Sequence, residues 1–153
     1  MRPRLLRKGT AALEFAIGSG VFVALFTGTF GFGYTFYTYN KLETATRNGS
    51  RYGGLLVYDQ NVQTVNSVPS SSFVTAVKNV TVYGTDNPGE GAVPVVGGLT
   101  TANVAVDVLF ANGEPDTVTV SIRDYQVRAL FQTWTANQKP RSTFRFMGRF
   151  APL

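Results

Sequence analysis

Residues 9–34 read GTAALEFAIGSGVFVALFTGTFGFGY, and this stretch decides the fold of the N-terminal part of the chain. It contains one acid, Glu14, and the 26 positions from Phe15 to Asn40 carry no charged side chain. As a helix, the 22 residues from Leu13 to Tyr34 span about 33 Å, enough for a hydrocarbon core of about 30 Å. The sequence therefore predicts a membrane helix with a carboxylate at its head, where a charge is costly and by default functional.

The charges on either side of this helix predict its orientation. Only Lys41 follows the span closely, whereas four basic residues precede it: Arg2, Arg4, Arg7 and Lys8. Basic flanks stay on the cytoplasmic side, so we expect a cytoplasmic N-terminus and an outer C-terminal domain, with Tyr34, Tyr37 and Tyr39 at the outer interface. A cleaved secretory signal fits poorly, because Glu14 interrupts its apolar region and the uncharged run is too long.

Two ridges of side chains run along the predicted helix. Small residues fall four apart and form one ridge: Ala12, Ala16, Gly20, Ala24 and Gly28. Bulky aromatic residues form a second ridge: Phe22, Phe26 and Phe30. Small ridges let helix backbones approach closely, so the first ridge predicts helix packing, although Gly and Ala are common in any membrane helix.

Composition argues against enzymatic function and against a resident cofactor. The chain has no Cys and no His, which removes thiol nucleophiles, His bases and nearly all transition-metal sites. No phosphate-binding glycine loop is present, and we expect no catalytic residue, cofactor, metal site or small-molecule substrate. The chain has 14 basic and 9 acidic residues, but four of the basic residues lie in the first nine positions. The remainder is nearly balanced, which gives no general attraction to nucleic acid.

The helix is predicted to continue beyond the membrane. Leu42, Ala45, Gly49 and Tyr52 share one face, and Gly53-Gly54 is expected to end the helix. We also expect an ion pair between Glu43 and Arg47 on this helix.

The rest of the chain predicts a small domain with one short helix and an antiparallel sheet. We expect a helix at about residues 73–79, capped by a serine of residues 70–72, then a strand at 80–83 and a loop at 84–101. Alternating residues predict a β-hairpin from Val104 to Arg123 with a five-residue connection that includes Pro115. Residues 125–135 fit either a helix or a strand. The fold class is therefore α+β.

The C-terminal residues predict a strand with two different faces. One face would carry Phe144, Phe146 and Phe150, and the other would carry Arg141, Thr143, Arg145, Met147 and Arg149. With Lys139, the arginines form a stripe that could bind a polyanion or an acidic neighbouring subunit. Charges on an edge strand more often prevent edge-to-edge association, and we favour that interpretation.

A basic leader ending in Gly9, then Thr10-Ala11-Ala12-Leu13-Glu14-Phe15 and an apolar helix, resembles the class III signal of type IV prepilins. Within that group it is similar to the TadE-like pseudopilins of tight-adherence (Flp) pili. Residues 43–53, ETATRNGSRYG, resemble the family's Ala-Arg-x-Gly-Ala-Arg-x-Gly stretch. Gly18-Ser19-Gly20 stands where many relatives have Pro, and two glycines loosen a helix less sharply.

The resemblance implies that a prepilin peptidase cuts after Gly9, which makes Thr10 the first mature residue, Glu14 the fifth and Phe15 the sixth. Cleavage creates an α-amino group that is cationic at its usual pKa of about 8. In pilins the implied partner of such a glutamate is the N-terminus of a neighbouring subunit. The alternative is that Glu14 only marks the cytoplasmic interface, but Gly9 and Phe15 at the family's offsets favour the pilin interpretation.

The resulting hypothesis divides the chain into a leader (1–9), a transmembrane and extended helix (10–54) and an extracytoplasmic domain (55–153). It predicts a structural minor pilin in the bacterial inner membrane that is assembled into the initiation or tip region of a pilus. The expected partners are other pilin subunits, the prepilin peptidase and the pilus assembly platform. The alternative is a single-pass anchored extracytoplasmic binding domain whose leader is not cleaved.

Overall fold

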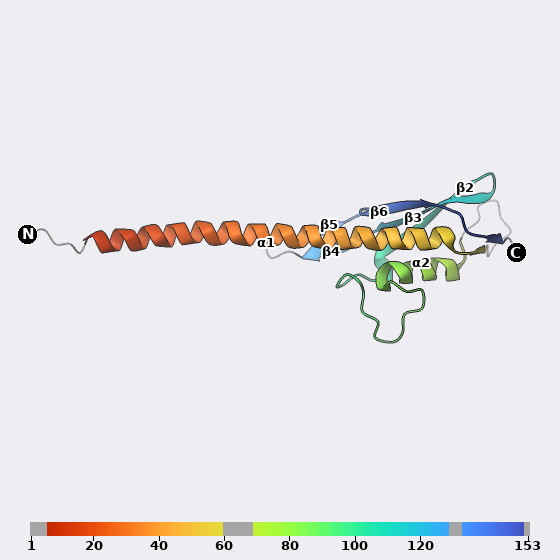
Figure 1. Ribbon diagram of the computed structural model, residues 1–153, viewed down its shortest axis with the longest axis horizontal. Coiled ribbons are helices and arrows are strands. Elements are labelled where there is room, and N and C mark those ends of the chain that lie inside the picture. The colour runs from red at the N-terminus through yellow and green to blue at the C-terminus, as the bar shows by residue number, and fades with distance from the viewer. Residues whose placement is uncertain (1–5, 60–68, 129–132, 152–153) are drawn as a thin grey trace, which may run out of the picture.

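The structure, a computed structural model, describes residues 6–59, 69–128 and 133–151. Its longest element is α1 (Leu6–Leu55), an unbroken helix of 50 residues, or about 75 Å at 1.5 Å per residue. The N-terminal half of α1 projects away from the domain, and its C-terminal half lies between α2 (Ser71–Tyr83) and a sheet (Figure 1). The predicted α+β class with a long N-terminal helix is confirmed.

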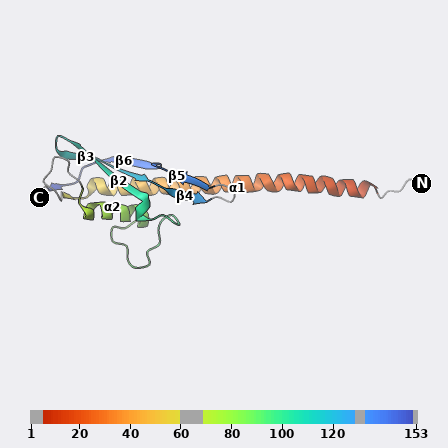
Figure 2. The same ribbon diagram turned by 180° about the vertical axis from the view of Figure 1, so that it is seen from behind.

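The other described elements are a 3-10 helix and seven short strands: β1 (Tyr58–Asp59), η1 (Thr101–Asn103), β2 (Val104–Ala111), β3 (Glu114–Ile122), β4 (Tyr125–Arg128), β5 (Thr133–Ala136), β6 (Arg141–Arg145) and β7 (Phe150–Ala151). Within the described residues, the strands form one antiparallel three-stranded sheet, in the order β2–β3–β6, and two two-stranded sheets, β4–β5 and β1–β7. The view from behind shows the same layers, with α1 between the three-stranded sheet and α2 (Figure 2).

The outer half of α1 is part of the hydrophobic core of the domain. Leu42, Ala45 and Gly49 are buried and Tyr52 is half-buried, which confirms the predicted face. The predicted ion pair on the opposite side of α1 is also present, with Arg47 Nη2 2.6 Å from Glu43 Oε1. The same helix therefore supplies both the apolar projection and one wall of the core.

The helix ends at Leu55, one residue after the stop predicted at Gly53-Gly54, and both glycines belong to its last turn. A Cβ atom on Gly53 would lie 3.0 Å from side-chain atoms of both Val77 and Val118. A Cβ atom on Gly54 would lie 3.0 Å from the carbonyl oxygen of Arg145. These glycines let the helix pass close to α2 on one side and to the sheet on the other.

Helix α2 is longer than predicted, and the expected strand at residues 80–83 is wrong. Ser70 caps the helix as expected, its Oγ accepting a hydrogen bond from the Phe73 backbone N at 3.2 Å. The helix continues through Tyr83 to Gly84, whose φ of 79° closes it in the left-handed conformation. Val80 to Val82 are all buried, because α2 packs against both α1 and β2. That double packing, and not a strand, accounts for the local apolar pattern.

The hairpin of β2 and β3 is confirmed, but its connection has two residues and not five. Asn112 and Gly113 turn the chain with φ values of 55° and 84°, and β3 starts at Glu114. Pro115 lies inside β3, opposite Phe110 and next to a register shift. It also lies outside the residues of β3 that pair with β6, so its missing N–H leaves that pairing intact.

Residues 125–135, which fitted either a helix or a strand, are strands where the structure describes them. β4 and β5 pair antiparallel, with Val127 opposite Trp134. The single strand expected at residues 141–150 is interrupted after Arg145. There the Phe146 backbone N bonds to the Asp116 carbonyl and the Met147 N bonds to the Gly54 carbonyl, which carries the chain across the end of α1. The predicted alternation of exposed and half-buried side chains continues nevertheless.

The loop from Gly84 to Thr100, predicted as a loop, is tied to the helices by Asp86. Tyr52 Oη donates to Asp86 Oδ2 at 2.9 Å, and Asn79 Nδ2 donates to the Asp86 carbonyl at 2.9 Å. Burial, and then the hydrogen bond and charge of Asp86, raise the pKa of Tyr52 above its usual 10. Ionisation of Tyr52 is therefore disfavoured in the folded chain.

Replacing Tyr52 with Phe should lower the free energy of unfolding by about 1 kcal/mol at neutral pH, because one hydrogen bond is lost. A raised folded-state pKa gives stability that is present below the unfolded pKa of about 10 and lost as pH rises through the folded value. Thermal unfolding should thus show a difference between the two chains that shrinks above pH 10. Tyr83→Phe is the control, and an equal pH response in that variant would contradict the assignment.

Candidate functional site

The candidate site is the projecting half of α1. Residues 9–26 are all exposed, including the large side chains of Leu13 (63%), Phe15 (78%) and Phe22 (68%). The helix is long and apolar enough to cross a membrane, and the most apolar part of it is not buried in the domain. An apolar surface of this length is not stable in water, so this half needs a bilayer or neighbouring helices.

The hydroxyl groups along this helix are bonded to the helix itself. Thr27 Oγ1 donates to the Val23 carbonyl at 2.7 Å, and Thr29 Oγ1 donates to the Leu25 carbonyl at 2.9 Å. The same bonding is made by Ser19, Thr35 and Thr38. Side chains that bond back to the preceding turn do not need water, and such a helix suits a hydrocarbon environment.

Both ridges predicted from the sequence are presented to the surroundings. The small residues are exposed, and a Cβ atom added to Gly20 or Gly28 would meet no atom within 4 Å. On the aromatic ridge, the ring centroids of Phe22 and Phe26 are 6.3 Å apart and those of Phe26 and Phe30 are 4.9 Å apart. The aromatic rings thus contact one another along the helix, and the small ridge leaves room for another backbone.

Glu14 and the proposed cleavage site lie at the start of α1. Glu14 is exposed, and among the residues whose side chains the structure describes it has no ion pair or hydrogen bond. Gly9 and Thr10 are also exposed and helical, so the bond between them lies near the first turn. Helix ends fray readily and Gly is a weak helix former, so a protease could reach this bond after local unwinding. The leader residues 1–5 lie outside the described residues.

Two members of the predicted arginine stripe, Arg141 and Arg145, are exposed on β6, which among the described strands pairs with β3 alone. Lys139 and Arg149 are also exposed but lie outside β6. Arg123, just after β3, lies 3.6 Å from Asp107 of β2. Thr119 and Thr143 share a hydrogen bond of 2.9 Å between their hydroxyls. A cationic edge strand of this kind hinders strand addition by another chain.

One feature was missed in the sequence analysis. Trp134 on β5 packs against Tyr39 of α1, with ring centroids 6.0 Å apart. On another face of α1, Lys41 Nζ lies 4.9 Å from the centroid of the Tyr37 ring. A separate hollow of about 500 Å³ is lined by Tyr34 and Thr38 of α1 and by Arg128 of β4. The sequence feature that could have indicated this contact is Trp134 itself, the single Trp of the chain. It lies in a segment that fitted either a helix or a strand.

The geometry defines a class of protein: an α+β domain carried on a helix whose other half is suited to a membrane. Within this class, the family model described as TadE-like protein matches residues 9–51. The match begins at Gly9, includes Glu14 and the whole apolar half of α1, and ends near the domain end of the helix. This agrees with the resemblance seen in the sequence and indicates a protein associated with Tad pili. Neither the search of curated proteins nor the search of solved structures gave a match.

Proposed function

We propose that this chain is a structural minor pilin of a tight-adherence pilus. In this proposal the prepilin peptidase cleaves after Gly9, α1 then packs with the helices of other pilins, and the domain from residue 55 onward lies outside the cytoplasmic membrane. The observation that supports it best is the family match over residues 9–51, which falls on an exposed apolar helix with a carboxylate at its head.

The charge of Glu14 gives the proposal a physical basis. Before cleavage the residues that precede it form a basic leader; afterwards the nearest cation at this end of the chain is the new amino group of Thr10. In a bundle of pilin helices, Glu14 of one subunit can pair with the amino group of a neighbour. Such a pair fixes the relative height of two helices, because removing one partner of a buried pair costs about 3–5 kcal/mol.

Intact-mass measurement of the membrane-extracted chain tests this function. In cells that contain the prepilin peptidase, the mass should correspond to the chain without residues 1–9, and peptidase-deficient cells should give the full-length chain. Gly9→Ile places a bulky side chain directly before the scissile bond, so this variant should have the full-length mass in both kinds of cell. An unprocessed N-terminus in the presence of an active peptidase would contradict the pilin proposal and favour a permanently anchored binding domain.

A further inference from the structure

Among the described residues of the domain, strands β4 (Tyr125–Arg128) and β5 (Thr133–Ala136), together called the β4–β5 hairpin below, lie nearest to the apolar half of α1. In Figure 1 both strands lie at this end of the domain, and the turn between β2 and β3 lies at the other. The Trp134–Tyr39 ring contact holds β5 against the helix, and the hollow lined by Tyr34 and Arg128 lies between α1 and β4. If α1 spans a bilayer, this hairpin faces the membrane surface.

The position of the hairpin along α1 can be compared with the thickness of a bilayer. The apolar span ends near Tyr34, and Tyr39 is five residues further on, about 7.5 Å along the axis. The polar layer on each side of the hydrocarbon core is about 5–8 Å thick. Trp134, which packs on Tyr39, is therefore at the level of the outer lipid headgroups, and Arg128 shares a hollow with a residue at the hydrocarbon edge.

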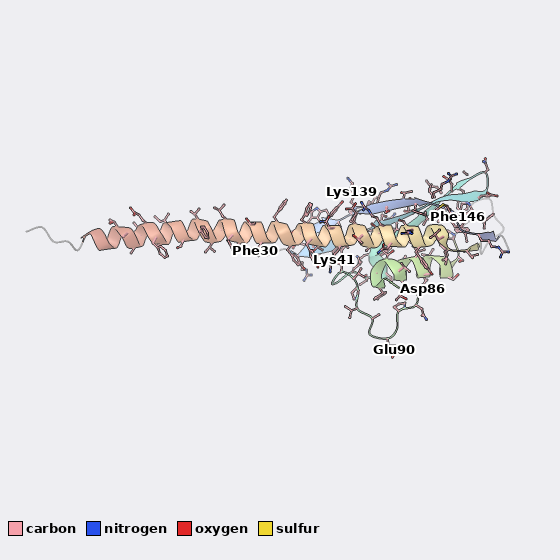
Figure 3. The ribbon with its side chains drawn as sticks, viewed as in Figure 1. Phe30, Lys41, Asp86, Glu90, Lys139 and Phe146 are labelled. Atoms are coloured by element: carbon pink, nitrogen blue, oxygen red, sulfur yellow. The ribbon has the colours of Figure 1, made fainter. Side chains whose placement is uncertain are left out.

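The side chains at this end have the chemistry of a headgroup-binding surface. Tyr34, Tyr37 and Trp134 are exposed by 57%, 56% and 41%, and amphipathic rings are favoured at the bilayer interface. Cationic side chains accompany them. Arg128 lines the hollow, and Figure 3 shows Lys41 and Lys139 at the same end of the domain. Asp124 lines the same hollow and balances the charge of Arg128 there, so the excess of cations at this end comes from Lys41 and Lys139.

The side of the hairpin that faces the domain is fixed by core packing and hydrogen bonds. Val127 and Ala136 belong to the hydrophobic core, and Tyr125 Oη donates to the Gly97 carbonyl at 2.7 Å. Asn103 Nδ2 donates to the carbonyls of Arg123 and Asp124 at 3.1 and 3.3 Å. Because one side of the hairpin is fixed in the core, the exposed side keeps a constant orientation relative to α1.

We propose that the β4–β5 hairpin, with Tyr34, Tyr37, Lys41 and Trp134, seats the domain on the phospholipid headgroups of the bilayer that α1 spans, and that Arg128 contacts a lipid phosphate. The proposal rests on the membrane insertion included in the proposed function. It adds a defined resting orientation of the subunit before assembly. Extraction of the subunit into a pilus must then separate this surface from the lipids.

Fluorescence of the single Trp tests the seating, with no need to introduce a reporter. The full chain is reconstituted into vesicles of phosphatidylethanolamine and phosphatidylglycerol that contain a nitroxide quencher, either on the headgroup or deep in the acyl chain. Trp134 should be quenched severalfold more strongly by the headgroup label than by the deep label. Absence of headgroup quenching in a chain that floats with the vesicles would overturn the seating and leave the pilin proposal intact; a chain that does not float would overturn both.

Two variants serve as controls. In Trp134→Phe/Leu109→Trp, the reporter moves to an exposed position on β2, near the far end of the domain, and headgroup quenching should be lost. Arg128→Glu should weaken the quenching of Trp134, whereas Arg145→Glu, on the outer sheet face, should not. Equal effects of the two charge reversals would contradict a contact between Arg128 and lipid phosphate.

Discussion

A chain that carries Glu14→Ala is expected to be cleaved and to fold as the unchanged chain does, but to co-assemble with other pilins about 100-fold less. Glu14 is far from the domain and, among described side chains, supports no contact of the folded chain, so stability should not change. In the assembled bundle, its loss leaves the amino group of a neighbour unpaired in an apolar environment. A cost of about 3–5 kcal/mol corresponds to about two to four orders of magnitude in association, and the expected loss is at the lower end of this range.

Co-purification of tagged subunits, together with intact mass, measures this effect. Glu43→Ala is the matched control, because Glu43 is another carboxylate on the same helix and its exposed pair with Arg47 contributes well under about 1 kcal/mol. That variant should co-assemble normally. If Glu14→Ala assembles as well as Glu43→Ala does, Glu14 only marks the membrane interface and the proposed pairing between subunits is wrong.

Gly49→Val should strongly destabilise the domain, lowering the free energy of unfolding by about 3 kcal/mol. A Cβ atom at this position would overlap Thr81 Oγ1 and would lie 3.2 Å from Thr81 Cβ and 3.5 Å from the Val77 carbonyl oxygen. Thr81 cannot move aside easily, because it is fully buried and its hydroxyl donates to that carbonyl at 2.7 Å. For a domain of about 100 residues, the loss corresponds to a decrease in Tm of about 12–24 °C.

Thermal unfolding and protease resistance of the purified chain report this change. Gly18→Val is the control, since Gly18 is on the same helix, outside the small-residue ridge, and nothing lies within 4 Å of an added Cβ. Gly49→Ala should show a smaller loss, and Thr81→Ala in the same chain should recover part of it by removing the overlapping hydroxyl. A Gly49→Val chain as stable as Gly18→Val would show that α1 and α2 do not pack as closely as described.

Sequence patterns predicted the helical framework well where the signal is local. The uncharged run, the four-residue ridges and the spacing of Leu42, Ala45 and Gly49 depend only on helix geometry, and α1 follows them. The alternation in β2 and β3 was equally informative, because one side of that hairpin faces the core. The basic leader and Glu14 also led to the family that matches residues 9–51.

The errors arose where contacts between distant elements decide the structure. Val80 to Val82 resemble a strand because α2 is packed on two sides. The end of α1 was predicted to within one residue, but the close neighbours that require glycine at Gly53 and Gly54 have no local signature. The contact of Trp134 with Tyr39 joins segments far apart in the chain and has no local signature. The partner of Glu14 belongs to another subunit in our proposal, so one chain can supply only half of that site.

The continuity of α1 has a mechanical consequence. The helix is continuous from Leu6 to Leu55, and its last turns are packed between α2 and the sheet. We therefore expect the apolar half of α1 and the domain to move as one rigid body. A rotation of the apolar half about its axis then rotates the domain as well. In a helical fibre of such subunits, the helical symmetry that relates neighbouring α1 helices would therefore also determine which surface of each domain faces outward.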